Sequence, residues 1–274
     1  MPLRTTSPAL PSGTNLSSTC STLAPGATCT ITVTPGNAPS AAQGNTAPVP
    51  VTLSVGGSNT NLLTPTVQVL THGSVYQGGY VFGIDDTTPV TGNVGGKVAA
   101  LNDAVGLAPG VIWSSNGNSG TTPDVAYNVV PGVDELSTPA LGRCNGGTDG
   151  ACNTNEITTF YTGVNHTYYA AGACRATQSG YSDWYLPAVC ELGGQASAGC
   201  APGGASMQAN LIDNGAVNVA ALPTAVNYWS STPRNGNPNF DAWVHRFATM
   251  GGAVSTGIDK STTLPVRCVR ALTL

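Results

Sequence analysis

The residues that could do chemistry gather between positions 228 and 270, where polar, aromatic and cationic side chains alternate with turn residues. Their order fits neither a helical nor a strand period. Amphipathic side chains on Gly-, Pro- and Asn-rich loops are typical of a ligand-binding surface on a rigid frame. The candidate binding residues are Arg234, Asn235, Asn237, Asn239, Phe240, Asp241, His245, Arg246, Thr249 and Met250. An ordinary solvated pair of loops is the alternative, and composition does not choose between the two.

Catalytic chemistry has less support in the same stretch. A Ser/His/Asp triad needs a positioned histidine, and His245 could pair with Asp241 by proximity. No nucleophile elbow or oxyanion motif accompanies that pair. We therefore expect a protein without enzymatic activity and without a cofactor.

Apolar residues bracket the candidate surface and would hold its loops in place. Tyr228 and Trp229 precede it, Trp243 and Phe247 lie within it, and the segment 266–269 follows it. Large aromatic side chains contribute most when they are buried, so we expect these residues to form a scaffold.

Eight cysteines accompany a low content of charged residues. No CxxC motif occurs and the three histidines lie far from any cysteine pair, so disulfides are favoured over zinc. Disulfides indicate an oxidising compartment. Eight cysteines allow 105 connectivities, of which we predict Cys20–Cys29, Cys144–Cys152, Cys190–Cys200 and Cys174–Cys268.

Composition bounds the class of protein. Only 8% of residues are charged, and 35 Gly and 20 Pro predict a chain rich in turns and loops. A hydrophobic content of 41% still predicts globular folding. The net charge of −4 and the absence of a basic cluster argue against a nucleic-acid partner.

Localisation follows from the cysteines and from the chain ends. No apolar run approaches the roughly 18 residues of a membrane span, and no export signal is visible at Met1-Pro2-Leu3. We expect an extracellular or outer-surface protein from which the export signal has been removed. Any membrane attachment, such as a lipid anchor, would likewise have been removed.

Residues 1–72 are predicted to form a small β segment. The stretches 28–33 and 49–55 alternate with a period of two, and a turn at 23–27 precedes the first of them. The run at 20–35, CSTLAPGATCTITVTP, resembles bacterial immunoglobulin-like sandwich modules. Because such a domain has about 100 residues, the segment is either a truncated sandwich or a spacer, and we favour a stalk.

Residues 73–274 are predicted to form the second domain. A strand is expected at 80–84, and the stretch 97–101 is either a strand or the start of a short helix. A helix is expected at 153–173 with Thr154 or Asn155 as its cap. A second helix is expected from Met207 to Asp213, ending near Asn214-Gly215.

The Gly-rich loop at 144–152 contains Asn145 and Asp149, whose side-chain oxygens are potential calcium ligands. Its carboxylates are too few and lack the spacing of a calcium loop, and we predict no metal.

A family resemblance appears in several blocks that occur in one order. These are GYSDWYLPAVCEL at 180–192, YWSST at 228–232, AWVHRF at 242–247 and VRCVR at 266–270. Together with the opening YQGGYVFGIDD and GGKVAAL, they resemble the secreted bacterial domain family of the Lcl (collagen-like adhesin) carboxy-terminal type over roughly 75–274. The resemblance implies an α+β fold similar to the C-type lectin and formylglycine-generating enzyme folds, although fold alone does not give function.

The resemblance also implies how the candidate surface would be used. In similar proteins the region after YWSS carries residues diversified by retroelement mutagenesis of template adenines, which yields Asn, Asp, His, Tyr, Phe, Ser, Thr or Arg. The polar candidates of this surface belong to that set. The expected function is therefore recognition of a protein or other ligand, and a glycan-binding adhesin is the alternative.

Two further readings of the resemblance are disfavoured. The triplets Glu-Pro-Asn, Gln-Pro-Asp and Trp-Asn-Asp of calcium-dependent lectins are absent. The formylglycine-generating fold would need a free cysteine, and the predicted pairs leave none.

The carboxylates of Asp183 and Glu191 are expected to be buried and bonded to backbone. Arg267 and Arg270 are expected to brace the terminal strand.

Overall fold

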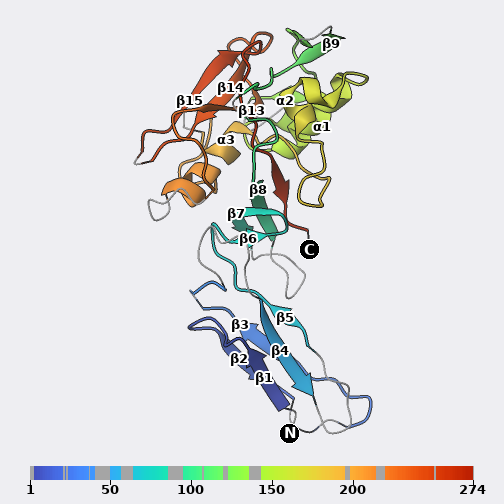
Figure 1. Ribbon diagram of the computed structural model, residues 1–274, viewed down its shortest axis with the longest axis vertical. Helices are drawn as coiled ribbons and strands as arrows, with labels where there is room; N and C mark the ends of the chain where they lie inside the picture. Colours follow the sequence, from blue (N-terminus) through green and yellow to red (C-terminus); the bar gives the residue numbers. More distant parts are fainter. Residues whose placement is uncertain are drawn as a thin grey trace. The chain divides into compact units, whose positions relative to one another are not determined.

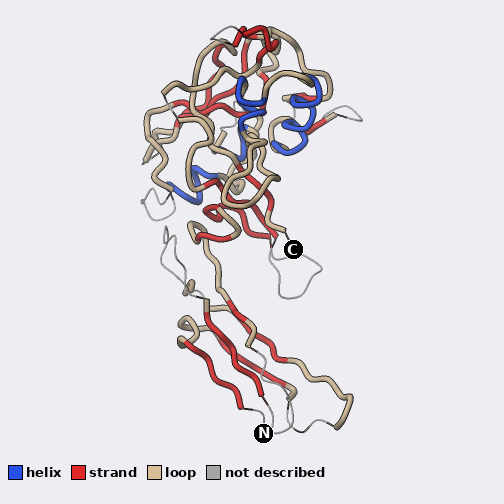
Figure 2. Tube along the Cα trace, turned by 45° about the vertical axis from the view of Figure 1, so that its right-hand side comes forward, coloured by secondary structure: helices blue, strands red, loops and turns tan. Residues whose placement is uncertain are grey.

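The computed structural model describes residues 3–20, 22, 24–36, 38–40, 50–56, 64–85, 95–106, 108–119, 123–135, 143–194, 198–213, 220–249 and 251–273. The chain forms two compact units, Met1–Val75 and Tyr76–Leu274. The expected domain boundary, between 72 and 73, lies three residues before this division. Small sheets, short helices and long connections make the fold α+β and loop-rich, as Figure 2 shows.

The first unit consists of two small antiparallel sheets. One has the order β1 (Leu3–Ser7), β4 (Val51–Gly56), β5 (Thr66–Val67), and the other pairs β2 (Asn15–Ser18) with β3 (Ile31–Thr34). Val51 and Leu53 alternate with more exposed neighbours along β4 and are buried, as the period of two predicts. The predicted strands at 28–33 and 49–55 thus correspond to β3 and β4, with β3 beginning three residues later.

The second unit begins and ends in one sheet, whose order is β16-β8-β7-β6. Its strands are β6 (Val75–Tyr76), β7 (Gly79–Asp85), β8 (Gly95–Ala100) and β16 (Val269–Ala271). The last strand returns antiparallel to β8, with Val269 opposite Ala99 (Figure 1). Arg270 braces it as expected, because its guanidinium donates to both carboxylate oxygens of Asp183 at 2.7 and 2.8 Å. Asp183 was predicted to be buried and bonded to backbone. This prediction is wrong, because its side chain is half exposed and pairs with Arg270.

A second, three-stranded sheet contains most of the candidate surface. The strands β13 (Asn227–Pro233), β14 (Asp241–Arg246) and β15 (Val254–Asp259) form an antiparallel meander, drawn in orange and red in Figure 1. Because each strand reverses direction, the connection 234–240 and the connection 247–253 lie at opposite ends of β14. Two smaller pairs join β9 (Ser115–Ser119) to β10 (Pro123–Val125), and β11 (Val133–Asp134) to β12 (Cys144–Asn145).

Three fully buried tryptophans occupy the core of the second unit, and each indole finds a backbone acceptor. Trp229 donates to the Val111 carbonyl at 2.9 Å, and Trp113 donates to the Ser230 carbonyl at 2.8 Å. Trp184 donates to Gln178 at 2.9 Å. The two reciprocal bonds fasten β13 to the loop that precedes β9, so the sheet and the loop share one core.

The predicted helix at 153–173 is wrong in extent. The structure has α1 (Gly150–Phe160), a 3-10 turn (His166–Tyr168) and α2 (Ala170–Ala173). Asp149 caps α1 by accepting from the Cys152 amide at 2.9 Å, in place of the predicted Thr154 or Asn155. The apolar period continued beyond α1, but Gly163 adopts a φ of 91° and ends the helical path.

Two shorter helical elements complete the second unit. α3 (Val189–Leu192) follows the LPA segment, and a π-helix spans Gln208–Asp213. The second predicted helix is therefore confirmed in position, with wider turns, and its predicted end at Asn214-Gly215 lies outside the described residues.

All eight cysteines are among the described residues, and they form the four predicted disulfides. The Cys174–Cys268 bond joins the end of α2 to the residue before β16, across 94 positions of the chain. Both cysteines are fully buried. The other three bonds close loops of 8 to 10 positions.

Replacing Cys174 and Cys268 by alanine should destabilise the second unit more than removing any local disulfide. In the chain-entropy model a loop near 100 residues contributes roughly 4.7 kcal/mol, against about 2.6 kcal/mol for a loop of nine residues. Urea unfolding of this variant and of Cys144→Ser/Cys152→Ser would measure the difference. An equal or larger loss in the second variant would contradict the prediction.

Candidate functional site

The predicted binding residues do not form one surface. Arg234, Asn235, Asn237, Asn239 and Phe240 lie on the connection 234–240, and Asp241 begins β14 beside them. Arg246 ends the same strand and Thr249 follows it, so both lie at its opposite end. Asp241 and Arg246 are five residue steps apart along the strand, so about 17 Å separates the two groups. Met250 lies outside the described residues.

The 234–240 loop is built from two consecutive turns. The amide of Asn237 donates to the Arg234 carbonyl, and the amide of Phe240 donates to the Asn237 carbonyl, each at 3.0 Å. The Arg234 amide closes the loop by donating to the Asp241 carbonyl at 3.1 Å. Backbone bonds therefore define the conformation of the loop.

The side chains of this loop face solvent. Asn235, Asn237 and Asn239 are exposed, and their amide groups make no hydrogen bond within the described part of the chain. Phe240 is 45% exposed and packs against Tyr127 with the ring centroids 5.0 Å apart. Free amide donors and acceptors beside an exposed aromatic ring are groups that a binding partner can use.

A buried ammonium group supports the loop from beneath. Lys260 is fully buried, and its Nζ donates to the carbonyls of Pro238 at 2.7 Å and Asn128 at 2.9 Å. The same Nζ lies 4.2 Å from the centre of the Trp113 ring. Burial lowers the pKa of Lys260 to about 8, while Asp241 acts in the opposite direction. This one side chain joins the 234–240 loop to the neighbouring segment that contains Asn128.

Further contacts hold the edges of the loop. The Arg234 guanidinium lies 3.3 Å from the Asp241 carboxylate and above the Trp243 ring. The amide of Asn235 donates to the Glu135 carboxylate, which belongs to a distant segment. Trp243 is buried against Val189 and the Cys190–Cys200 disulfide, as its predicted scaffold role requires.

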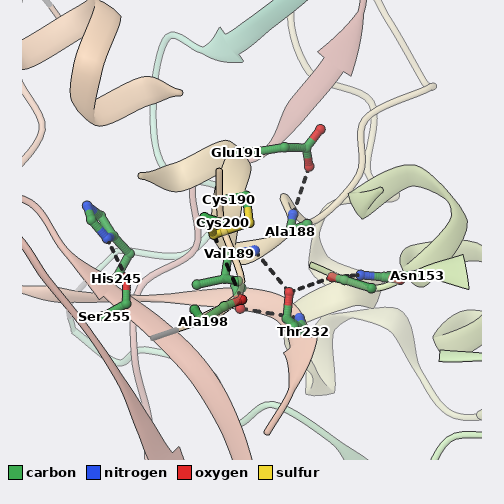
Figure 3. Close-up of a disulfide and its surroundings, with 12 residues drawn as sticks. Asn153, Ala188, Val189, Cys190, Glu191, Ala198, Cys200, Thr232, His245 and Ser255 are labelled. Atoms are coloured by element: carbon green, nitrogen blue, oxygen red, sulfur yellow. Dashed lines mark hydrogen bonds between the residues drawn. A yellow bond between two sulfur atoms is a disulfide. The ribbon is translucent and has the colours of Figure 1, made fainter. Parts of the chain in front are cut away.

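His245 does not belong to the candidate surface. It is fully buried, with Nδ1 3.0 Å from the Ser255 hydroxyl and Nε2 3.5 Å from the Gln208 side-chain oxygen. Figure 3 shows this pair next to the Cys190–Cys200 disulfide. Burial lowers its pKa to about 4. The prediction was wrong because the face of β14 to which His245 belongs is covered by the helical segments around Gly193 and Gln208.

Four residues near the loop belong to other segments of the chain and were not predicted. Tyr127, Glu135, Asp259 and Lys260 all contact the loop or its neighbours, and none stood in the predicted set. The only signal in the sequence was an isolated lysine, Lys260, between apolar and turn residues. Nothing in that pattern indicates its partners, because they lie more than 20 residues away along the chain.

A cavity of about 530 Å³ opens on another side of the unit. Its polar lining includes Lys97, Glu191 and Gln208, beside the Cys190–Cys200 disulfide. The Glu191 carboxylate is already bound by Lys97, by the Tyr185 hydroxyl and by two backbone amides. Glu191 is therefore buried and bonded to backbone amides, as predicted.

Among the described residues, no side chains are arranged to bind a metal ion or to form a Ser/His/Asp triad. No three His, Cys, Asp or Glu side chains gather there to hold a metal ion. In the described ranges no helix is long and apolar enough to cross a membrane. His245 contacts Ser255 rather than Asp241, with a pKa too low for a general base at neutral pH.

Stability should fall as the pH is lowered from 6.5 to about 4, because of His245. The unfolded chain takes up this proton near pH 6.5, whereas the folded protein resists it until about pH 4. The unfolded state therefore binds more protons in this window, and the loss amounts to about 3 kcal/mol. Urea midpoints between pH 7 and pH 4 would measure it. The variant His245→Gln should lose less stability over the same range, and an identical slope would contradict the assignment.

Replacing Lys260 by methionine should loosen the 234–240 loop. The carbonyls of Pro238 and Asn128 would lose their donor, at a cost of about 2 kcal/mol in unfolding free energy. Hydrogen exchange at the amides of Asn237, Phe240 and Asp241 should become faster. Arg246→Met, at the opposite end of β14, is the control and should leave these rates unchanged. Unchanged exchange in Lys260→Met would show that the loop does not depend on this contact.

Comparison with known proteins places the second unit in a family. The model of the Lcl C-terminal domain matches residues 106–270, which are 165 of the 274 residues. A comparison with curated protein sequences found no significant match. The matched segment contains α1, the three-stranded sheet, the 234–240 loop and three of the four disulfides. On this evidence the chain belongs to the Lcl C-terminal domain family.

Proposed function

We propose that this protein is an extracellular binding protein that recognises a protein ligand through its 234–240 loop. Membership of the Lcl C-terminal domain family indicates a surface-binding, adhesin-type role. Four disulfides fit an extracellular protein. The ligand itself is the part that we propose.

The observation that carries the proposal is the contrast between the loop's backbone and its side chains. Backbone bonds and the buried Lys260 fix the loop, whereas its three asparagine amides and Phe240 remain available to a partner. Binding to a preformed loop avoids much of the entropy cost of ordering it. An ordinary solvated loop would not need a buried ammonium group beneath it.

The fold supports a C-type-lectin-like assignment, which we propose for the second unit. Its first and last strands share one sheet, and a separate three-stranded sheet holds the candidate loop. We further propose that the exposed positions of this loop are diversified by a retroelement. Arg234, Asn235, Asn237, Asn239 and Phe240 have residue types that such mutagenesis yields, and all five are exposed.

A glycan-binding adhesin without calcium dependence is the second candidate. A polyanionic sugar would need Arg234 and Arg246 to lie close together, but they lie at opposite ends of β14. The formylglycine-generating enzyme fold is a more distant alternative, and its cysteine chemistry conflicts with eight paired cysteines. For the first unit we propose an immunoglobulin-like stalk, supported by its small antiparallel sheets.

Changing the loop should abolish binding without unfolding the protein. The test variant replaces Arg234, Asn235, Asn237, Asn239 and Phe240 together by serine. Exposed substitutions usually change stability by no more than about 0.5 kcal/mol each, so the Tm should change little. Peptides selected from a phage-displayed random library on the wild type should fail to bind this variant.

Trp243→Ala is the matched control, because it should unfold the second unit while leaving the loop sequence intact. Truncating a buried aromatic side chain costs roughly 3–5 kcal/mol. Unfolding of the serine variant would show that the loop is scaffold. Peptides that bind the wild type and the serine variant equally would move the binding site away from the loop.

A further inference from the structure

Three apolar side chains are exposed on the candidate loop and on the segment 127–129 that contacts it. Tyr127, Val129 and Phe240 are 39%, 47% and 45% exposed. Tyr127 and Val129 precede and follow Asn128, whose carbonyl accepts from Lys260 together with the carbonyl of Pro238. This shared donor brings the 127–129 segment beside the 234–240 loop, and we call the three residues the apolar patch.

The patch is fixed in place before any partner arrives. The rings of Tyr127 and Phe240 meet at 5.0 Å with an interplanar angle of 42°. The Tyr127 hydroxyl donates to the Asp259 carboxylate at 3.0 Å, and the Phe240 carbonyl accepts from the Lys260 amide at 2.8 Å. Large aromatic side chains held exposed in this way are typical of interaction surfaces.

One carboxylate contacts the patch, and two others contact neighbouring residues of the loop. Asp259 is exposed and bonded to Tyr127, Glu135 binds the amide of Asn235, and Asp241 faces Arg234. Arg234 of the loop pairs with Asp241, and Lys260, which binds the loop, is fully buried. The solvent-facing charge nearest the aromatic rings is therefore negative, in a protein whose net charge is −4.

We propose that the partner presents a basic peptide segment to this patch. The inference rests on the proposed function of the 234–240 loop and names the chemistry of its partner. A lysine or arginine side chain can lay its aliphatic stem on Val129 and the aromatic rings, with its cation facing Asp259. Aromatic faces and a carboxylate both attract a cation, whereas the carboxylates would repel a polyanionic glycan.

Octalysine is the probe for the test. The polyanions octaglutamate and heparin are the controls of opposite charge. Titration calorimetry on the full chain at low and at physiological salt should detect octalysine and neither polyanion. Tyr127→Ala/Phe240→Ala and Asp259→Asn should each weaken octalysine binding at least tenfold. Asp259→Asn keeps an oxygen that can accept from Tyr127, so it removes the charge and leaves the rings in place.

Two control variants separate this site from general attraction to an acidic protein. Phe160→Ala removes an exposed aromatic ring on α1, and Asp213→Asn removes one carboxylate at the distant cavity. Both should bind octalysine within twofold of the wild type. An absence of octalysine binding, equal losses in the controls, or heparin binding that depends on Tyr127 and Phe240 would overturn the proposal.

The phage selection distinguishes this inference from the proposed function. Selected peptides that require the loop and are rich in Lys or Arg would support both. Peptides that require the loop but lack basic residues would leave the proposed function standing and refute the basic partner. Peptides that do not require the loop would refute both.

Discussion

The second unit depends on the buried carboxylate of Glu191. One of its oxygens accepts from the amides of Ala188 and Gly150, at 2.7 and 3.2 Å, and the other binds Tyr185 and Lys97. It thus joins the start of α1, the start of α3 and strand β8; Figure 3 shows its bond to Ala188. A Cβ at Gly150 would lie 2.4 Å from this carboxylate, so glycine is required there. Breaking such a buried charge network destabilises strongly, because partners are left unpaired.

A second buried charge, Lys260, joins separate segments at the candidate site, as Glu191 joins segments of the core. Its ammonium group replaces water as the donor for two loop carbonyls, so loops with little secondary structure acquire a defined shape. The supporting groups are buried and the contacting groups are exposed. This separation allows the exposed side chains to change identity while the fold persists, which is what a diversified or specialised binding surface needs.

The polar interior explains why so few charged residues suffice. Arg267 donates to Asp103 at 2.6 Å and Arg270 donates to Asp183, and both arginines are almost fully buried. Buried charges retain their ionised form only when they are paired and hydrogen-bonded. Four disulfides add covalent constraints on a chain in which loops outnumber helices. Fold stability is therefore concentrated in a few buried contacts and not in the exposed side chains of the 234–240 loop.

The amino-acid sequence by itself indicated the family through its ordered motifs, and the resemblance to that family implied the α+β class. Cysteine spacing predicted the four disulfide pairs. It also named Arg234, Asn235, Asn237, Asn239 and Phe240 as candidate surface residues, and these are exposed. Only the tertiary structure decided that His245 is buried, that Arg246 and Thr249 lie at the far end of β14, and that Tyr127 and Lys260 join the site. The physical reason is distance along the chain. Burial and side-chain partnership depend on segments more than 20 residues apart, and no local pattern encodes which of them meet.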